Sequence, residues 1–376
     1  MINADSVVVV DEITTASKDY KIGRLTLNKP KALNALDLEM AGIMLDALRQ
    51  WQARSDIVAV VIDAAGEKAF CAGGDIVSMY NSMVEAHGEV PAFLETFFET
   101  EYTLDYTIHN YNKPIIVWGS GIVMGGGMGL LCGASHRVVT ETSRLAMPEI
   151  SIGLYPDVGG SYFLPRLPGK SGLFLGLTGG QMNAADAMYV GLADVMVSSA
   201  EKENLLQGLV DYAWNETSSS TLAEAVNTVL SRLQKPETEV QSNIEPNMPL
   251  INELCSANNV SEVVNAILTA DMQGDKWLSR AQSTLSKGSP ITMHLVFEQC
   301  TKGATMSLAD CFRMEADMSC RCGESGEFQE GVRALLIDKD MTPQWKFKKV
   351  EDVPEAEIAH FFTSPWSKEA HPLAAL

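Results

Sequence analysis

The sequence predicts an α/β fold followed by a mostly helical C-terminal region. In the first part of the chain, short β-branched runs alternate with segments whose apolar residues recur three and four apart, and this alternation is typical of layered α/β structures. Later in the chain only the helical spacing continues. With 376 residues, the chain is long enough for a large core and a second lobe. We therefore expect an α/β core at residues 1–205 and a mainly helical region at residues 206–376.

The elements are expected in a definite order. Strands are predicted at 7–10, 23–27, 57–62, 115–118 and 136–140. A helix is predicted at 38–53, between the second and third strands, from its apolar spacing. Helices of the C-terminal region are predicted at 203–214, 221–233, 260–270 and 291–300. The segment 236–249 is polar, acidic and bracketed by prolines, so a linker or loop is predicted there.

One apolar stretch could be mistaken for a membrane span. Residues 115–134 contain no acidic or basic side chain, and a run of this length can cross a bilayer. However, the stretch is rich in glycine and has three glycines in succession at 125–127. Glycine costs about 1 kcal/mol per helical position relative to alanine. A buried strand, a glycine turn and a buried helix are therefore the better interpretation.

Charge and cysteine content narrow the class of protein. The formal net charge of −20 opposes binding to nucleic acid or to an anionic membrane surface. The seven cysteines are scattered, which favours reduced thiols rather than a disulfide scaffold. Cys320 and Cys322 lack a second pair at zinc spacing, and no metal site is expected. The first ten residues do not look like a signal peptide, so we expect a cytoplasmic protein.

Two glycine-rich segments follow predicted strands. In segment 68–76, Gly73 and Gly74 allow a sharp turn that leaves N–H groups facing a ligand; an ordinary turn with Asp75 as helix cap is the alternative. Segment 121–129 would place unpaired N–H groups and the positive end of a helix at one point. Such a point can stabilise an oxyanion, although tight helix–sheet packing also explains the glycines. The spacing does not match a dinucleotide-binding fingerprint.

Two carboxylates follow, at Glu149 and Asp157. Pro148 and Pro156 fix turns that present them on loops among apolar neighbours. Desolvation there would raise the cost of their charge and tune one of them as a base or nucleophile. A pair of solvated loop carboxylates is the alternative. No Gly-x-Ser-x-Gly segment is present, which disfavours a serine hydrolase.

Taken together, these segments resemble the crotonase (enoyl-CoA hydratase/isomerase) superfamily. Asn-Lys-Pro-Lys-Ala-Leu-Asn-Ala-Leu at 28–36, Ala-Phe-Cys-Ala-Gly-Gly-Asp-Ile at 69–76 and the glycines at 125–127 are similar, in order, to that family's coenzyme-A site. Further segments are similar to the 3-hydroxyisobutyryl-CoA hydrolases, a branch of the superfamily: 147–149, 153–166, 330–340 and 343–346. The resemblance implies a spiral of repeated ββα units.

The resemblance also implies roles for individual residues. The backbone N–H groups of Gly74 and Gly126 would form the oxyanion hole. Hydratases of the family carry a first glutamate where this chain has Gly129, whereas their second glutamate is kept as Glu149. Asp157 stands where those hydratases carry no acid. The pair of Glu149 and Asp157 therefore implies hydrolysis of a short branched 3-hydroxyacyl-CoA thioester, most closely 3-hydroxyisobutyryl-CoA, in valine catabolism.

The substrate would be held by residues that the resemblance supplies: Glu101, Lys31, Ala32, Leu33, Ala72, Gly73, Asp75 and Ile76. For Glu101 a solvated helix face, and for Lys31 an ordinary surface lysine, are the alternatives. No cofactor is expected, since coenzyme A is part of the substrate. Acyl-CoA is the expected partner, and a homo-oligomer is implied unless the helical tail covers the surface used for it. A hydratase or isomerase using Glu149 alone, and a non-catalytic acyl-CoA-binding protein, remain alternatives.

Overall fold

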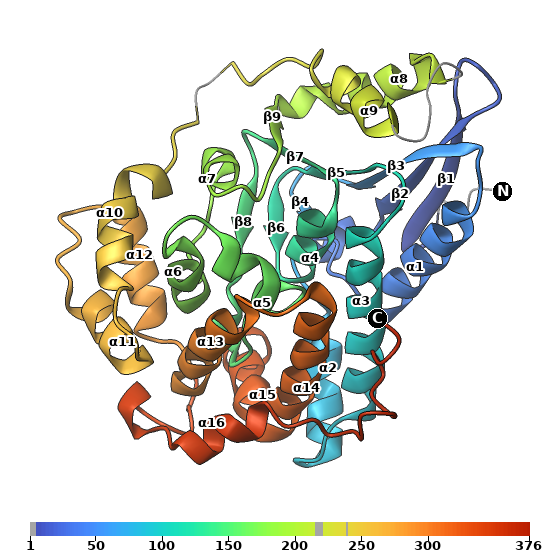
Figure 1. The fold of residues 1–376 in the computed structure, drawn as a ribbon. Coiled ribbons are helices and arrows are strands. Elements are labelled where there is room, and N and C mark those ends of the chain that lie inside the picture. Colours follow the sequence, from blue (N-terminus) through green and yellow to red (C-terminus); the bar gives the residue numbers. More distant parts are fainter. Residues whose placement is uncertain (1–4, 215–220, 238–239) are drawn as a thin grey trace. The chain divides into compact units, whose positions relative to one another are not determined.

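The computed structural model describes residues 5–214, 221–237 and 240–376 (Figure 1). Contacts between residues divide the chain into two compact units, and the chain passes between them more than once. The first unit, here called the core unit, comprises Met1–Gly74, Leu104–Leu145 and Met182–Ser242. The second, here called the helical unit, comprises Asp75–Thr103, Ala146–Gln181 and Asn243–Leu376. As a domain boundary, the division near residue 205 stays a prediction.

The core unit holds almost all of the strands. Its elements are β1 (Val8–Thr14), β2 (Lys21–Leu27), η1 (Pro30–Ala32), α1 (Leu38–Gln52), β3 (Ile57–Ala64), β4 (Ala69–Cys71), β5 (Ile115–Gly119), β6 (Ile122–Met124), α4 (Gly126–Gly133), β7 (His136–Thr140), β8 (Arg144–Ala146), α7 (Ala184–Tyr189), β9 (Val195–Val197), η4 (Ser199–Glu201), α8 (Lys202–Asp211) and α9 (Leu222–Leu230). Every strand predicted from the sequence is present, and so is the helix predicted at 38–53.

The helical unit is built from short helices. Its elements are α2 (Ile76–Ala86), η2 (Glu149–Ile152), α5 (Gly160–Phe163), η3 (Leu164–Arg166), α6 (Ser171–Thr178), α10 (Ile244–Leu254), α11 (Val260–Thr269), α12 (Lys276–Leu285), α13 (Pro290–Gly303), α14 (Leu308–Ser325), α15 (Glu327–Val332), η7 (Arg333–Ile337), η8 (Val350–Asp352) and α16 (Glu355–Phe361). Helix α3 (Ala92–His109) begins in this unit and ends in the core unit.

Two sheets arise from one repeated pattern. The larger sheet has the order β1-β2-β3-β5-β7-β9, and the smaller has the order β4-β6-β8. Strand β1 pairs antiparallel with β2, and the other printed pairs of the larger sheet are parallel. Along the chain, β3 and β4, β5 and β6, and β7 and β8 follow one another, so each repeat gives one strand to each sheet. This pattern is the ββα spiral that the resemblance implied, and it confirms the predicted fold class.

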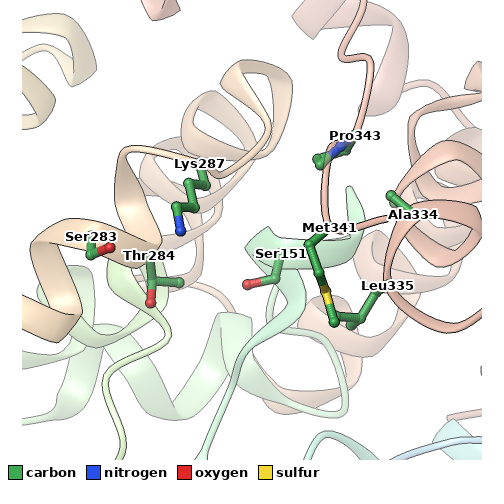
Figure 2. Close-up of a pocket in the computed structure, with 9 residues that line it drawn as sticks. Ser151, Ser283, Thr284, Lys287, Ala334, Leu335, Met341 and Pro343 are labelled. Carbon is green, nitrogen blue, oxygen red and sulfur yellow. The ribbon is translucent and has the colours of Figure 1, made fainter. Parts of the chain in front are cut away.

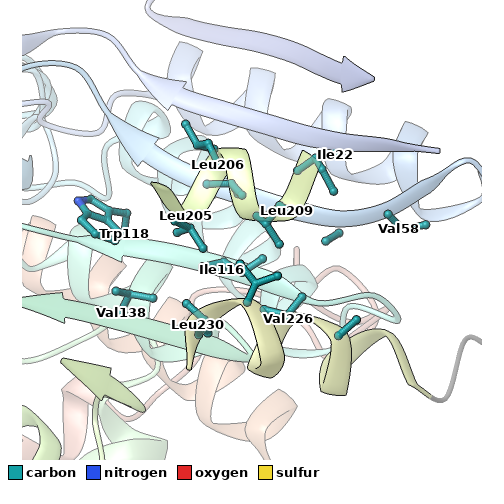
Figure 3. Packing of buried hydrophobic residues seen from close by; sticks show 14 of the residues in the cluster. Ile22, Val58, Ile116, Trp118, Val138, Leu205, Leu206, Leu209, Val226 and Leu230 are labelled. Carbon is teal, nitrogen blue, oxygen red and sulfur yellow. The ribbon is translucent and has the colours of Figure 1, made fainter. Parts of the chain in front are cut away.

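A continuous apolar cluster lies between the larger sheet and two helices of the core unit (Figure 3). Sheet residues such as Ile22, Ile116 and Val138 pack with Leu209 of α8 and Val226 of α9. All of these side chains are at most 1% exposed. Helices α8 and α9 lie in the segment predicted as helical, and their apolar faces cover the sheet.

The apolar stretch at 115–134 forms β5, β6 and α4, which confirms the prediction of a strand, a turn and a helix. Within the described ranges, no helix combines the length and apolar character needed to cross a bilayer. The three-residue strand β6 was not predicted, because so short a run carries no readable alternation. Strands β4 and β8 were missed for the same reason.

The predicted loop at 236–249 is wrong in its second half, while its residues 238–239 lie outside the described residues. Helix α10 begins at Ile244 and runs through Pro249. Its buried residues, Ile244, Met248, Ile251 and Leu254, recur at helical spacing. Pro246 lies in the first turn, where a missing N–H costs little. At Pro249, burial of the apolar face therefore outweighs the loss of one backbone hydrogen bond.

Replacing Leu209 with Ala should lower the free energy of unfolding by about 2–5 kcal/mol, because it leaves a cavity in the cluster under the larger sheet. Urea unfolding followed by circular dichroism measures the change. Gln207→Ala, on an exposed position of the same helix, is the matched control and should change stability by less than about 0.5 kcal/mol. Equal losses for the two variants would contradict the described packing of α8.

Candidate active site

Two glycine turns follow neighbouring strands of the smaller sheet. Strand β4 pairs parallel with β6, with Cys71 opposite Val123. Gly74 comes three residues after β4, and Gly126 comes two residues after β6. Because parallel strands end at the same edge of a sheet, both amides belong to one edge of the core unit. Gly73 and Gly125, which precede them, have φ values of 110° and 46°, a backbone region that favours glycine.

The N-terminus of α4 lies tightly against β4. A Cβ atom added at Gly127 would lie 2.5 Å from the carbonyl oxygen of Cys71, so only glycine fits there. Gly126 is the first residue of α4, where backbone N–H groups have no acceptor within the helix. The glycines therefore allow close helix–strand packing, as the alternative interpretation of this segment expected. The oxyanion hole at this turn stays a prediction.

The segments predicted to hold coenzyme A are joined by their backbones. Ala72 N donates to Leu33 O at 3.1 Å, and Leu36 N donates to Gly73 O at 2.8 Å. The structure thus brings Leu33, Ala72 and Gly73 together beside Gly74. Ala32 ends the 3₁₀ helix η1 in the same segment. The part of the structure predicted to hold coenzyme A is therefore joined mainly through backbone atoms.

A buried amide that the sequence reasoning missed holds this segment in place. Asn34 is 1% exposed, and its Nδ2 donates to Ala65 O and Ala69 O at 3.0 and 2.9 Å. Its Oδ1 accepts from Lys29 N at 2.9 Å. The ammonium of Lys29 is paired with Asp37 at 2.6 Å. The sequence signal was an asparagine between the apolar residues 32–33 and 35–36, where a buried amide needs several backbone partners.

Glu149 and Asp157 are both buried in the helical unit, each about 5% exposed. Glu149 opens η2, and its Oε2 atom has no hydrogen-bond partner among the described residues. Burial, together with the nearby charge of Asp157, raises the pKa of Glu149 well above its usual value. Burial raises the pKa of Asp157 to about 6, although a hydrogen bond from Tyr102 acts in the opposite direction. The alternative of two solvated loop carboxylates is therefore wrong.

A chain of buried hydroxyl groups lies behind Asp157. Tyr102 Oη donates to Asp157 Oδ2 at 2.7 Å and lies 2.7 Å from Ser319 Oγ. Ser319 Oγ is also 2.8 Å from Tyr155 Oη, which donates to the backbone oxygen of Glu315. Each hydroxyl has one proton, so Ser319 can donate to only one of the two tyrosine oxygens at a time. This arrangement could not be predicted from the sequence, because its members are up to 217 residues apart.

The other predicted substrate residues have varied positions. Glu101 is 2% exposed on α3 and belongs to the same unit as Glu149, so a solvated helix face is excluded. Asp75 caps α2 by accepting from Ser78 N and Ser78 Oγ, as the alternative interpretation expected. Ile76 is the half-buried first residue of α2. Lys31 is exposed in the core unit.

A pocket of about 280 Å³ in the helical unit lies next to η2 (Figure 2). It is lined by Ser151, Ser283, Thr284, Lys287, Gly331, Ala334, Leu335, Met341 and Pro343. Neither Glu149 nor Asp157 lines it, so the pocket does not mark the acidic pair. In the described part of the chain, no group of three or more His, Cys, Asp or Glu side chains could hold a metal ion.

Comparison with known proteins identifies relatives over most of the chain. A sequence model of the enoyl-CoA hydratase/isomerase family matches residues 22–362. The 3-hydroxyisobutyryl-CoA hydrolase of Danio rerio, named as mitochondrial, is 41% identical over 92% of this chain and 87% of its own length. The corresponding protein of Homo sapiens, also named as mitochondrial, is 35% identical over the same shares.

Two solved structures are similar throughout. One is titled as an enoyl-CoA hydratase from Rhodobacter sphaeroides, with a TM-score of 0.82, 33% identity, and coverage of 96% of this chain and 98% of that chain. The other is titled as a carnitinyl-CoA dehydratase from Mycobacterium thermoresistibile, with a TM-score of 0.82, 32% identity, and coverage of 96% and 97%. The similarity therefore includes the C-terminal helices as well as the spiral.

Replacing Glu149 with Gln should stabilise the protein increasingly as the pH rises above about 4.3, the ordinary pKa of glutamate. The folded-state pKa of Glu149 is raised, so ionisation of the buried acid costs the wild type stability from that pH upward. Each unit of raised pKa corresponds to about 1.4 kcal/mol. Urea unfolding of both proteins between pH 4 and pH 8 measures the difference. A difference that does not change with pH would contradict the raised pKa.

Proposed function

The chain belongs to the enoyl-CoA hydratase/isomerase family, and on this basis we propose that it is a thioester hydrolase that converts 3-hydroxyisobutyryl-CoA to 3-hydroxyisobutyrate and free coenzyme A. The observation that carries the proposal is the buried pair of Glu149 and Asp157. Hydration of a double bond needs an activated water and a proton donor, whereas the position of the first hydratase glutamate is Gly129 here. The identity of 35–41% to relatives named as this hydrolase supports the same choice.

In the proposed reaction, backbone amides polarise the thioester carbonyl. The N–H groups of Gly74 and Gly126 donate to its oxygen, where negative charge develops as the carbon is attacked. Removing one such donor in other enzymes costs about 3–4 kcal/mol of transition-state stabilisation. The two parallel strands that end at these turns support the assignment, because they fix both amides at one edge of the core unit.

Glu149 supplies the attack by one of two routes. As a general base it takes a proton from water, the hydroxide adds to the carbonyl carbon, and collapse expels the coenzyme-A thiolate. As a nucleophile it attacks directly, the thiolate leaves, and water then cleaves a mixed anhydride. Either route needs an ionised Glu149, and its partner-free Oε2 atom supports a role in attack. Asp157 accepts a hydrogen bond from the 3-hydroxyl group or assists proton transfer.

A single turnover in oxygen-18 water separates the two routes. Label in the carboxyl group of Glu149, read by mass spectrometry of its peptide, requires the anhydride. If the label is found only in the released acid, the reaction is repeated in the presence of hydroxylamine, which converts an anhydride at Glu149 into a hydroxamate. Absence of both modifications supports the general-base route.

Coenzyme A would lie against the backbone that joins Leu33, Ala72 and Gly73, with Ala32 and Lys31 at its outer edge. The two backbone hydrogen bonds between these segments support this placement. Because Lys29 is paired with Asp37, the exposed Lys31 is the better cation for a phosphate. Asp75 and Ile76 are proposed to lie, with Ala72, against the adenine end of coenzyme A, and Glu101 is proposed to lie near the acyl portion.

Thiol release across a panel of short acyl-CoA esters tests the function directly. We expect release to be fastest with 3-hydroxyisobutyryl-CoA, and Glu149→Ala should lower kcat by at least about 1,000-fold, since the attacking group is lost. Circular dichroism shows whether the variant is folded. Unchanged release by Glu149→Ala would instead indicate that the acid is not catalytic and would revive the non-catalytic acyl-CoA-binding alternative.

Replacing Asp157 with Asn should move the acidic limb of the kcat/KM profile to lower pH. The charge of Asp157 raises the pKa of Glu149, so its removal lets Glu149 ionise more easily. The limb reports the pair rather than one residue. At the same time kcat should fall, because the acceptor for the 3-hydroxyl group is lost. A limb that moves to higher pH would contradict the assignment.

A hydratase is the second candidate, favoured by the two structures titled as hydratase and dehydratase. Incubation with a short enoyl-CoA separates the candidates. A hydratase consumes the double bond without releasing thiol, whereas the proposed hydrolase releases free thiol from 3-hydroxyisobutyryl-CoA.

We further propose that the protein is a cytoplasmic homo-oligomer. The relatives cited above are named as mitochondrial, so the location has to be measured by fractionation of the source cells.

Sedimentation velocity measures the oligomeric state, and a monomer at micromolar concentration would contradict the proposal of a homo-oligomer.

A further inference from the structure

Glu315 is a buried acid that the proposed mechanism does not use. It lies on α14 and is fully buried. Its Oε2 atom accepts from Gly159 N and its Oε1 atom accepts from Ser161 N, each at 2.8 Å. These amides follow Asp157 by two and four residues. The carboxylate therefore holds both sides of Gly160, at the point where the Asp157 loop enters α5.

The loop held by Glu315 contains a strained residue. Val158 has a φ of 50°, although a β-branched residue avoids the left-handed region. Such a conformation persists only where surrounding contacts impose it. Val158 stands between Asp157 and the first amide that Glu315 binds. The two hydrogen bonds of Glu315 are therefore well placed to impose it.

Other side chains of the C-terminal helices hold the same loop. Ser319 follows Glu315 by one helical turn and lies within hydrogen-bond distance of both Tyr102 and Tyr155. From α13, Gln299 Nε2 donates to Pro156 O at 3.0 Å. The loop is thus held before and after Asp157, and Tyr102 is oriented toward the acid itself.

We propose that Glu315, supported by Ser319, is a positioning residue that fixes the loop carrying Asp157 and thereby sets the place of that acid for the reaction. The Glu149 pair alone would not require an acid on α14, and burying one there costs stability, since burial raises the pKa of Glu315 to about 8. We therefore attribute to Glu315 the role of fixing the backbone geometry of the loop that follows Asp157. This inference gives the C-terminal helices a part in the proposed function, on which it rests.

Hydrogen exchange of the Gly159 and Ser161 amides tests the contact without any activity measurement. Glu315→Gln replaces one acceptor by an NH₂ group that faces another donor. We expect these amides to exchange about 10-fold faster in this variant, the change that corresponds to the loss of one hydrogen bond. Unchanged exchange would overturn the proposal.

The matched control is Glu327→Gln. Glu327 is also a buried acid of the helical unit, and it accepts from Ser289 Oγ and Lys346 N rather than from the Asp157 loop. This variant should leave the exchange of Gly159 and Ser161 unchanged. If it accelerates their exchange as much as Glu315→Gln does, the effect is general loosening and the proposal fails.

A double-mutant cycle tests whether Glu315 acts through Asp157. Glu315→Gln should lower kcat by about 10- to 100-fold with little change in KM, as expected for a misplaced catalytic group. In an Asp157→Asn background the same change should have almost no further effect on kcat. Equal losses in both backgrounds would show that Glu315 does not act through Asp157.

Ser319→Ala provides a second variant should Glu315→Gln fail to fold. It keeps the carboxylate and removes only the hydroxyl between the tyrosines, and we expect a smaller loss of kcat that is likewise absent in the Asp157→Asn background. An equal loss in that background would overturn the supporting role of Ser319. If the wild type releases no thiol from any ester, the proposed function fails, whereas the exchange experiment still decides the contact.

Discussion

The burial of two neighbouring carboxyl groups without a cation is the constraint on which the helical unit depends. Among the described residues, neither Glu149 nor Asp157 forms an ion pair, and burial raises the pKa of both. The cost of the charge on Asp157 is offset by the hydroxyl of Tyr102, whereas Glu149 keeps an oxygen without a partner. One acid is thus oriented by a side-chain hydrogen bond, and the other is the acid to which the proposed reaction assigns the attack. Ionising Glu149 in this buried position lowers the free energy of unfolding.

Local chemistry explains how far the sequence predicted the fold. The regular strands of the larger sheet were predicted because buried parallel strands have near-continuous apolar sequences rich in β-branched residues, as in β3 (Ile57–Ala64). The strands of the smaller sheet are three residues long, which is too short for any periodicity. Helix α10 was missed because two prolines outweighed an apolar spacing that tertiary packing then used. The helix propensity of individual residues decides the secondary structure only where tertiary packing does not oppose it.

The candidate site was predictable in part, for a different reason. Glycine-rich turns after strands and acids among apolar residues are visible in the chain, so Glu149 and Asp157 could be selected as candidates. The choice of Gly74 and Gly126 within the turns came from the resemblance to the crotonase superfamily. The groups that hold those residues could not be selected. Asn34 binds backbone more than 30 residues away, and Ser319 reaches Tyr102 across 217 residues. Side chains that support a site are recognised only by their partners, and a sequence does not show partners that the fold brings together.

The spacing after the short strands bears on how such a protein can change its chemistry. Strands β4, β6 and β8 end at Cys71, Met124 and Ala146, and the residues proposed for the reaction follow each of them by two or three positions, at Gly74, Gly126 and Glu149. In the proposed reaction, successive copies of one structural repeat therefore have separate tasks, two of backbone and one of side chain. A new reaction can arise by exchanging a residue behind a single repeat, while the other copies keep the thioester and the scaffold unaltered.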